Sequence, residues 1–273
     1  MPFRRRLEGR AWGVRLISDF TLMILGAFAG VAATWFTQWL ARYVGTIRPT
    51  GELWSWLAPD GQQVELVVST GAHHAGEYTN LIFPTEAEAA AEIKNFLGAT
   101  LRRRISIHQS DGLGDRLDRD LVLIGGPVNN AVTERVLALP DIPFKFENHT
   151  IVHEISGQRW HAALRVIDGR SVVWTDYCLI ARIPNPFNRD RGLLLIGGSR
   201  AYGTLGGARM LLRNRVRSTL DEIRECGDYF AAIVETPVMG GEPGASTFAQ
   251  VWPLHLGQGL PPAMHPTSAQ QST

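Results

Sequence analysis

The sequence predicts an α/β protein in which an N-terminal transmembrane helix precedes one globular domain with a mostly parallel sheet and a β-hairpin insertion. Three observations lead to this prediction. Residues 20–41 contain no charged side chain. From residue 64 onward, apolar runs typical of strands alternate with stretches of helical period. Two of those runs, residues 121–126 and 193–198, read LVLIGG and LLLIGG and so nearly repeat each other.

Length and composition support one domain and exclude several classes of protein. Of the 273 residues, about 190 remain after a terminal anchor and a polar tail are removed, which suits one domain with a full-sized core. The 27 Lys and Arg residues balance the 26 Asp and Glu residues, so no overall field favours nucleic acid as a partner. Cys178 and Cys226 are too few for a disulfide framework or a zinc site. We therefore expect no metal and no cofactor.

The predicted boundaries follow from these shifts in composition. They are a basic tail over 1–19, a transmembrane helix over 20–41, a linker over 42–63, the α/β domain over 64–240 and a disordered tail over 253–273.

The uncharged segment 20–41 is long enough to cross a hydrocarbon core of about 30 Å as a helix. It predicts a single-pass membrane protein with the lipid bilayer as a partner. A cleaved signal peptide is one alternative, because Arg4, Arg5 and Arg6 resemble its basic start, and a buried core helix is another. Arginines are more numerous before the segment than after it, which favours an extracytoplasmic domain but leaves its side open. The Gly26-x-x-x-Gly30 spacing allows a homo-oligomer.

The first half of the domain reads as alternating strands and helices. Residues 64–68 are a buried strand, and Thr85-x-x-Glu88 is a capping box that opens a helix. A second strand is expected over 104–108 and a central parallel strand over 121–124. Asn129 or Asn130 then caps a helix that ends before Pro140.

The second half contains the predicted insertion and the repeated unit. Short segments between residues 144 and 183 are rich in β-branched and aromatic residues, which predicts a hairpin or an antiparallel edge. Asn185-Pro186-Phe187 reads as a turn. The second LLLIGG strand, helices over 203–213 and 215–226, and a strand over 229–234 complete the domain.

The candidate site lies in the loops that follow the apolar strands. Two strands with the same Gly-Gly ending place two loops at one edge of the sheet, where open α/β folds bind ligands. Glycines let backbone N–H groups approach a ligand, and an arginine can pair with a phosphate or carboxylate. The alternative is that the glycines only form tight turns and Asn129 only caps a helix. The predicted ligand-binding residues are Ser69, Thr70, Gly71, Gly125, Gly126, Asn129, Gly197, Gly198, Arg200, Gly203 and Thr204.

Other polar residues suggest chemistry less directly. His73, His74 and Glu77 offer metal ligands or a general base, although a surface loop explains them better because no third ligand is fixed by spacing. The sequence contains no G-x-G-x-x-G, Walker, G-x-S-x-G or H-E-x-x-H pattern. Catalysis therefore has no anchor in the sequence, and whether the protein is an enzyme stays open.

The runs LVLIGGPVNNAVTERVL, DYCLIARIPNPF and LLLIGGSRAYGTLGGA resemble a group of little-characterised bacterial and archaeal α/β domains. More distantly they resemble Rossmann-like, nucleotide-sensing SLOG domains, and the IGGP…N piece is similar to a segment of archaeal S-layer proteins. The SLOG resemblance implies a nucleotide or nucleotide-derived signal bound by the glycine-rich loops.

Three functions follow as hypotheses. The first is a membrane-anchored sensor or binding module for a small anionic, nucleotide-like ligand at the Gly-rich loops. The alternative is a cell-envelope protein with a structural or interaction role and no catalytic activity. The third is a nucleotide hydrolase that uses Glu77, Glu134 or Asp176 as acid or base.

Overall fold

The computed structural model describes residues 36–37, 54, 57, 63–69, 83–99, 101–212, 223 and 227–256. The chain divides into two units, Met1–Arg48 and Pro49–Thr273. All strands and the three longer helices described below belong to the second unit.

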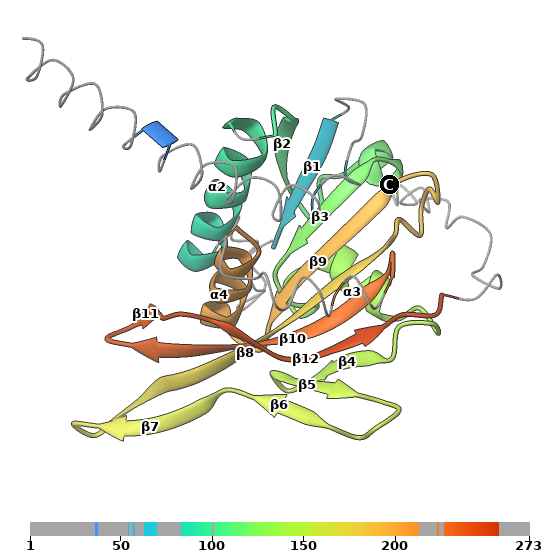
Figure 1. Ribbon diagram of the computed structural model, residues 1–273. Helices are drawn as coiled ribbons and strands as arrows, with labels where there is room; N and C mark the ends of the chain where they lie inside the picture. The colour runs from blue at the N-terminus through green and yellow to red at the C-terminus, as the bar shows by residue number, and fades with distance from the viewer. Residues whose placement is uncertain are drawn as a thin grey trace, which may run out of the picture. The chain divides into compact units, whose positions relative to one another are not determined.

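The second unit is built around a mixed nine-stranded sheet (Figure 1). Its strands are β1 (Gln63–Val68), β2 (Arg104–Gln109), β3 (Asp120–Ile124), β7 (Ala163–Ile167), β8 (Arg170–Pro184), β9 (Gly192–Gly198), β10 (Phe230–Met239), β11 (Glu242–Pro243) and β12 (Thr247–Pro253). The order is β11-β10-β8-β9-β3-β1-β2, with β12 paired to β10 and β7 paired to β8.

The prediction of a mostly parallel sheet is wrong. The strands β2, β1, β3 and β9 run parallel to one another, but β8 pairs antiparallel with β9, β10 and β7. Strand β10 pairs antiparallel with β11 and β12 as well. The reason is the short connection over residues 185–191, because a tight hairpin can join only antiparallel strands, whereas a parallel pair needs a crossover of a dozen residues or more.

The sheet is covered on both faces. Helices α2 (Pro84–Ala99) and α4 (Ala201–Leu212) pack on one face. The other face carries α3 (Ala131–Leu137), the 3₁₀ helix η1 (Gly114–Asp118) and a small sheet of β4 (Phe144–Glu147), β5 (Thr150–His153) and β6 (Arg159–His161). Alternate residues of the central strands serve the two cores. In β3, Val122 and Ile124 join the α2–α4 core, and Leu121 and Leu123 join the other.

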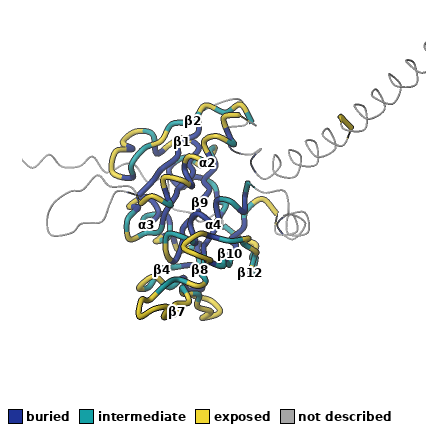
Figure 2. Tube along the Cα trace, turned by 90° about the vertical axis from the view of Figure 1, so that its left-hand side faces the viewer, coloured by how far each residue is buried: buried dark blue, intermediate teal, exposed yellow. Residues whose placement is uncertain are grey.

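Burial on both faces explains why LVLI and LLLI are continuous apolar runs rather than alternating ones. All residues of β3 and β9 are buried, whereas every residue of β7 is exposed. Figure 2 shows this contrast between the inner strands and the projecting β7 hairpin. Trp54, within the predicted linker, is also fully buried, and its indole N–H donates to the Leu211 carbonyl at 3.4 Å.

The prediction of a transmembrane helix and of a single-pass membrane location is contradicted. Within the described ranges, no helix is long and apolar enough to cross a membrane. A crossing helix needs about 20 consecutive apolar residues. The longest described helix, α2, has 16 residues and carries several charged side chains. Of the segment 20–41 itself, only Phe36 and Thr37 are described, and both are helical.

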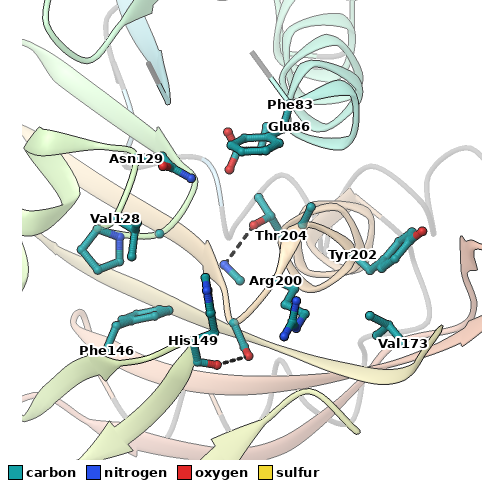
Figure 3. A pocket seen from close by; sticks show the side chains of 15 residues that line it. Phe83, Glu86, Val128, Asn129, Phe146, His149, Val173, Arg200, Tyr202 and Thr204 are labelled. Carbon is teal, nitrogen blue, oxygen red and sulfur yellow. Dashed lines mark hydrogen bonds between the residues drawn. The ribbon is translucent and has the colours of Figure 1, made fainter. Parts of the chain in front are cut away.

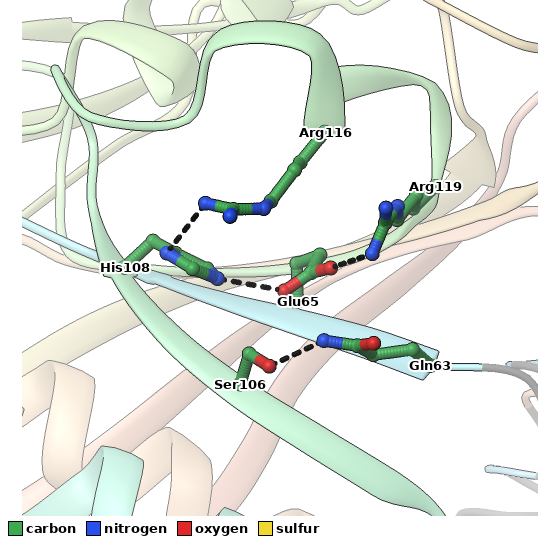
Figure 4. Close-up of polar contacts among 6 residues, drawn as sticks. All are labelled: Gln63, Glu65, Ser106, His108, Arg116 and Arg119. Atoms are coloured by element: carbon green, nitrogen blue, oxygen red, sulfur yellow. Dashed lines mark hydrogen bonds and ion pairs between the residues drawn. The ribbon is translucent and has the colours of Figure 1, made fainter.

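A buried carboxylate holds the loop before β3 against the edge of the sheet (Figure 4). The Glu65 side chain on β1 is fully buried; one oxygen accepts from Arg119 at 2.8 Å and the other contacts His108 Nε2 at 2.9 Å. Arg116 reaches the second ring nitrogen of His108 at 3.4 Å. The ion pairs satisfy the buried charge, which is the condition for keeping a carboxylate in a core.

Candidate functional site

The two Gly-Gly loops lie side by side, as the repeat predicts. Strands β3 and β9 pair in register from Leu121 and Leu193 to Ile124 and Ile196. The Gly125 N–H continues the ladder by donating to the Ile196 carbonyl at 2.9 Å. Ser69 follows β1, which pairs with β3 on its other side. The parallel strands therefore all end at one edge of the sheet.

A cavity of about 320 Å³ opens at this edge (Figure 3). Its walls come from the start of α2, the two Gly-Gly loops, the turn between β4 and β5, and β8. Most of its lining is apolar, and a few polar groups converge on it. The lining residues are Phe83, Glu86, Gly126, Pro127, Val128, Asn129, Phe146, His149, Val173, Gly198, Ser199, Arg200, Ala201, Tyr202 and Thr204.

Several N–H groups of the second Gly-Gly loop are already bound within the protein. The Gly198 N–H donates to Thr204 Oγ1 at 2.9 Å. The buried Asp176 carboxylate accepts from Arg200 N–H at 3.1 Å and from Gly203 N–H at 2.6 Å. This aspartate thus occupies the start of α4, a position where a ligand anion would otherwise be favoured. We therefore do not find the open cradle of backbone donors that the glycines suggested.

Burial raises the pKa of Asp176 above its ordinary value, and the N–H groups that it accepts from, together with Arg200, counter that shift. Because both carboxylate oxygens accept from backbone N–H groups, Asp176 is a capping residue. It does not line the cavity, so it is not available as the predicted acid or base.

The two neighbouring asparagines have different tasks. Asn130 is fully buried; its side-chain oxygen accepts from Val132 and Thr133 N–H at 3.1 Å and thereby caps α3. Its amide nitrogen donates to the carbonyls of Val67 and Ile124. The Asn129 side chain makes no hydrogen bond to the described part of the chain and lies on the wall of the cavity (Figure 3).

A turn from the small sheet completes the cavity. Asn148 and His149 both have positive φ, 47° and 61°, as the two-residue turn between β4 and β5 requires. The hydroxyl group of Ser199 donates to the His149 carbonyl and fixes this turn against the second Gly-Gly loop. The exposed His149 ring therefore lies beside Arg200 at the cavity.

Glu86 is the one buried carboxyl group among the lining residues. Its exposed fraction is 5%, and its Oε2 atom has no hydrogen-bond partner among the described residues. Burial raises the pKa of Glu86 from 4.5 to about 7, and the neighbouring Ser69 hydroxyl partly offsets the rise. A carboxyl group with such a pKa is present in both protonation states near neutral pH.

Gly125 makes room for this carboxyl group. Its φ is +107°, which favours glycine, and a Cβ atom there would lie 2.2 Å from Ser69 Oγ and 2.7 Å from Glu86 Oε1. Gly125 is therefore required by the packing behind the cavity rather than by contact with a ligand.

The structure separates the eleven predicted residues into three groups. Lining the cavity are Gly126, Asn129, Gly198, Arg200 and Thr204. Supporting it from behind are Ser69, Gly125, Gly197 and Gly203; Gly203 lets α4 approach the Tyr177 carbonyl. Thr70 and Gly71 lie outside the described residues.

The remaining predicted chemistry does not gather here. His73, His74 and Glu77 lie outside the described residues, and Glu134 is an exposed residue of α3 that does not line the cavity. In the described ranges, no three His, Cys, Asp or Glu side chains are grouped as a metal site would need.

Sequence reasoning missed Glu86 and His149. Glu86 had a signal: Glu86, Ala89, Ala90, Ile93 and Leu97 form the buried stripe of α2, so this acid falls on an apolar face. The predicted capping box drew attention to Glu88 instead. The helix begins at Pro84, so Thr85 is inside it, and Glu88 pairs with Arg209. His149 had no such signal, because its place depends on how the small sheet docks.

Comparison with known proteins adds no assignment. No protein-family model matches the sequence, and no curated protein matches it significantly. The resemblance to SLOG domains and to the S-layer segment therefore stays a prediction.

Proposed function

We propose that the protein is a binding module for a small anionic, nucleotide-like ligand, held in the cavity between the two Gly-Gly loops. The observation that carries the proposal is this cavity of about 320 Å³, bordered by the side chains of Asn129 and Arg200, which have no hydrogen-bond or ion-pair partner among the described residues. Its size is at the small end of ligand sites, roughly 300–1,000 Å³, and suits a nucleoside monophosphate better than a dinucleotide.

The anionic part of the ligand is assigned to Arg200. This side chain is exposed, lines the cavity and forms no ion pair with any described residue. An arginine fork suits a phosphate or carboxylate group, and Asn129 and His149 supply further hydrogen bonds nearby. Because Asp176 and Thr204 already use N–H groups of the loop, side chains rather than the backbone provide the main charge recognition.

The rest of the ligand is expected to be flat and largely apolar. Phe83, Phe146 and Tyr202 contribute aromatic rings to the walls, and Val128 and Val173 add aliphatic surface. Aromatic walls favour stacking on a heterocyclic ring, and a bare inorganic anion would gain nothing from them.

The first test is a ligand panel followed by thermal unfolding. We expect adenosine or guanosine monophosphate to raise the Tm by several degrees at about a hundred times Kd, since ligand binding then adds about 2.7 kcal/mol to the free energy of unfolding. Inorganic phosphate alone should give a much smaller shift. A panel of nucleotides that leaves the Tm unchanged would contradict the proposal.

The Arg200→Ala variant tests the assigned anion contact. We expect Kd to rise about tenfold or more, because a hydrogen bond to a charged group contributes roughly 1.5–3 kcal/mol. Arg104→Ala is the matched control: Arg104 is also exposed, but it begins β2 at the opposite edge of the sheet. Equal affinities of the two variants, measured by titration calorimetry, would remove Arg200 from the site.

A further inference from the structure

The carboxyl group of Glu86 is positioned to contact whatever occupies the cavity. It enters from the first turn of α2, lies beside Phe83 and faces the space above Thr204 and Arg200 (Figure 3). Its Oε2 atom is buried yet has no partner in the described ranges. A buried polar atom without a partner costs free energy, and a ligand in the cavity would supply the missing hydrogen bond.

The hydrogen-bonding pattern of Glu86 depends on whether its carboxyl group is protonated. A protonated carboxyl group donates one hydrogen bond and accepts another, whereas a carboxylate only accepts. The titratable or charged groups that face the same cavity are His149 from the β4–β5 turn, Arg200 from the loop before α4, and Tyr202 from α4. Ser69, which follows β1 and lies behind the cavity, and Asn129, from the loop after β3, are uncharged.

We propose that Glu86 reads the edge of a purine-like ring in this cavity, an inference that rests on the proposed binding function. In its protonated form the carboxyl group pairs with an adjacent acceptor and donor, a pattern present on the N1 and N6 edge of adenine and on the O6 and N1 edge of guanine. As a carboxylate it pairs with two adjacent donors, the pattern on the N1 and N2 edge of guanine alone. The affinity of the cavity for adenine relative to guanine therefore falls as pH rises.

The geometry places the base beside Glu86, and the pKa of Glu86 sets the pH of the change. The aromatic side chains of Phe83 and Phe146 offer walls for the ring while Arg200 takes the phosphate group. The pKa of Glu86, raised to about 7 by burial, places the change of pattern near neutral pH. A surface glutamate would be a carboxylate throughout this range and would not discriminate in this way.

The experiment compares adenosine monophosphate (AMP) with guanosine monophosphate (GMP) by titration calorimetry at about pH 6 and about pH 8. Both ligands carry the same phosphate group, so its titration largely cancels in the ratio of the two Kd values. We expect the ratio of the two affinities to move toward GMP by about tenfold or more at the higher pH.

The Glu86→Gln variant makes the test specific to this side chain. Glutamine presents one donor and one acceptor at both pH values, so the ratio of the AMP and GMP affinities should be the same at both. Glu88→Gln, two residues along the same helix on an exposed side chain paired with Arg209, should behave as the wild type. His149→Gln should keep the pH-dependent shift of the ratio, whatever its effect on the affinity for both nucleotides, because the base contact is assigned to Glu86.

The outcomes separate the two proposals. Binding that depends on Arg200 but shows the same ratio of AMP and GMP affinities at both pH values, or the same shift of that ratio in Glu86→Gln, overturns the role of Glu86 and leaves the binding function intact. Absence of binding by either nucleotide at both pH values overturns both.

Discussion

At the scale of single residues, the site depends on a glycine after β3 that leaves room for side chains from the end of β1 and from α2. Gly125 has no side chain, and the volume that a Cβ atom would fill is used by Ser69 Oγ and the Glu86 carboxyl group. The consequence is a buried acid whose pKa is raised to about 7. A glycine in a strand-to-helix turn thus determines the chemistry of a residue 39 positions earlier in the chain.

This burial predicts a specific effect of pH on stability. The pKa of Glu86 is about 7 in the folded protein and 4.5 as its ordinary value, so between these pH values only the folded state retains the proton. The free energy of unfolding therefore falls as pH rises from about 4.5 to about 7, by about 3 kcal/mol in total. The Glu86→Gln variant lacks this contribution. We therefore expect its free energy of unfolding, relative to that of the wild type, to be higher at about pH 8 than at about pH 5.

Urea unfolding of the wild type and the Glu86→Gln variant at the two pH values checks this expectation. All other titrating groups are common to the two proteins, so the difference between the curves reports Glu86. If the free energies of unfolding of the two proteins changed equally between the two pH values, the pKa of Glu86 would not be raised in the folded protein.

At the scale of elements, Asn130 and Asn129 show how one dipeptide serves both the fold and the site. Asn130 holds the start of α3 to the ends of β1 and β3 through four hydrogen bonds. Asn129 turns toward the cavity. Substitutions at these two asparagines therefore distinguish an effect on stability from an effect on ligand binding.

We expect Asn130→Ala to lower the free energy of unfolding by about 2 kcal/mol or more, because it removes a helix cap and leaves buried carbonyl groups without donors. Asn129→Ala should change stability by less than about 0.5 kcal/mol and weaken nucleotide binding. Chemical denaturation and calorimetry on both variants measure the two effects. If Asn129→Ala proved the more destabilising change, the assignment of the two side chains would be reversed.

The sequence predicted correctly those elements whose burial and position follow from the local pattern of residues. The runs LVLI and LLLI are buried on both faces, so their composition identified central strands, and their shared Gly-Gly endings correctly placed the two loops together. The direction of β8 is not a local property. It follows from the seven residues between β8 and β9, which permit only a hairpin.

At the scale of the whole molecule, the cavity exists because two sheets meet. The parallel strands bring β1, β3 and β9 to one edge, and the small sheet docks its turn there through Ser199 and His149. The sequence predicted the first part, since equal strand endings imply equal positions. It could not predict the second, because no pattern in residues 144–161 indicates against which loop the turn packs.

The predicted transmembrane segment also shows that a strong local pattern does not decide the structure. An uncharged run over 20–41 is a strong local pattern, but no described helix is long and apolar enough to cross a membrane. The ligand proposal does not depend on that segment, because every residue lining the cavity belongs to the second unit.

The most direct test of the central claim, that the cavity at the Gly-Gly loops binds a small anionic ligand, is backbone NMR of the full chain titrated with AMP. We predict that shift changes concentrate in residues 126–129, 148–149 and 198–202, three segments that are distant in sequence and come together at this cavity. Shifts confined to the exposed β7–β8 hairpin, or to the opposite edge around Arg104 and Arg119, would contradict the account.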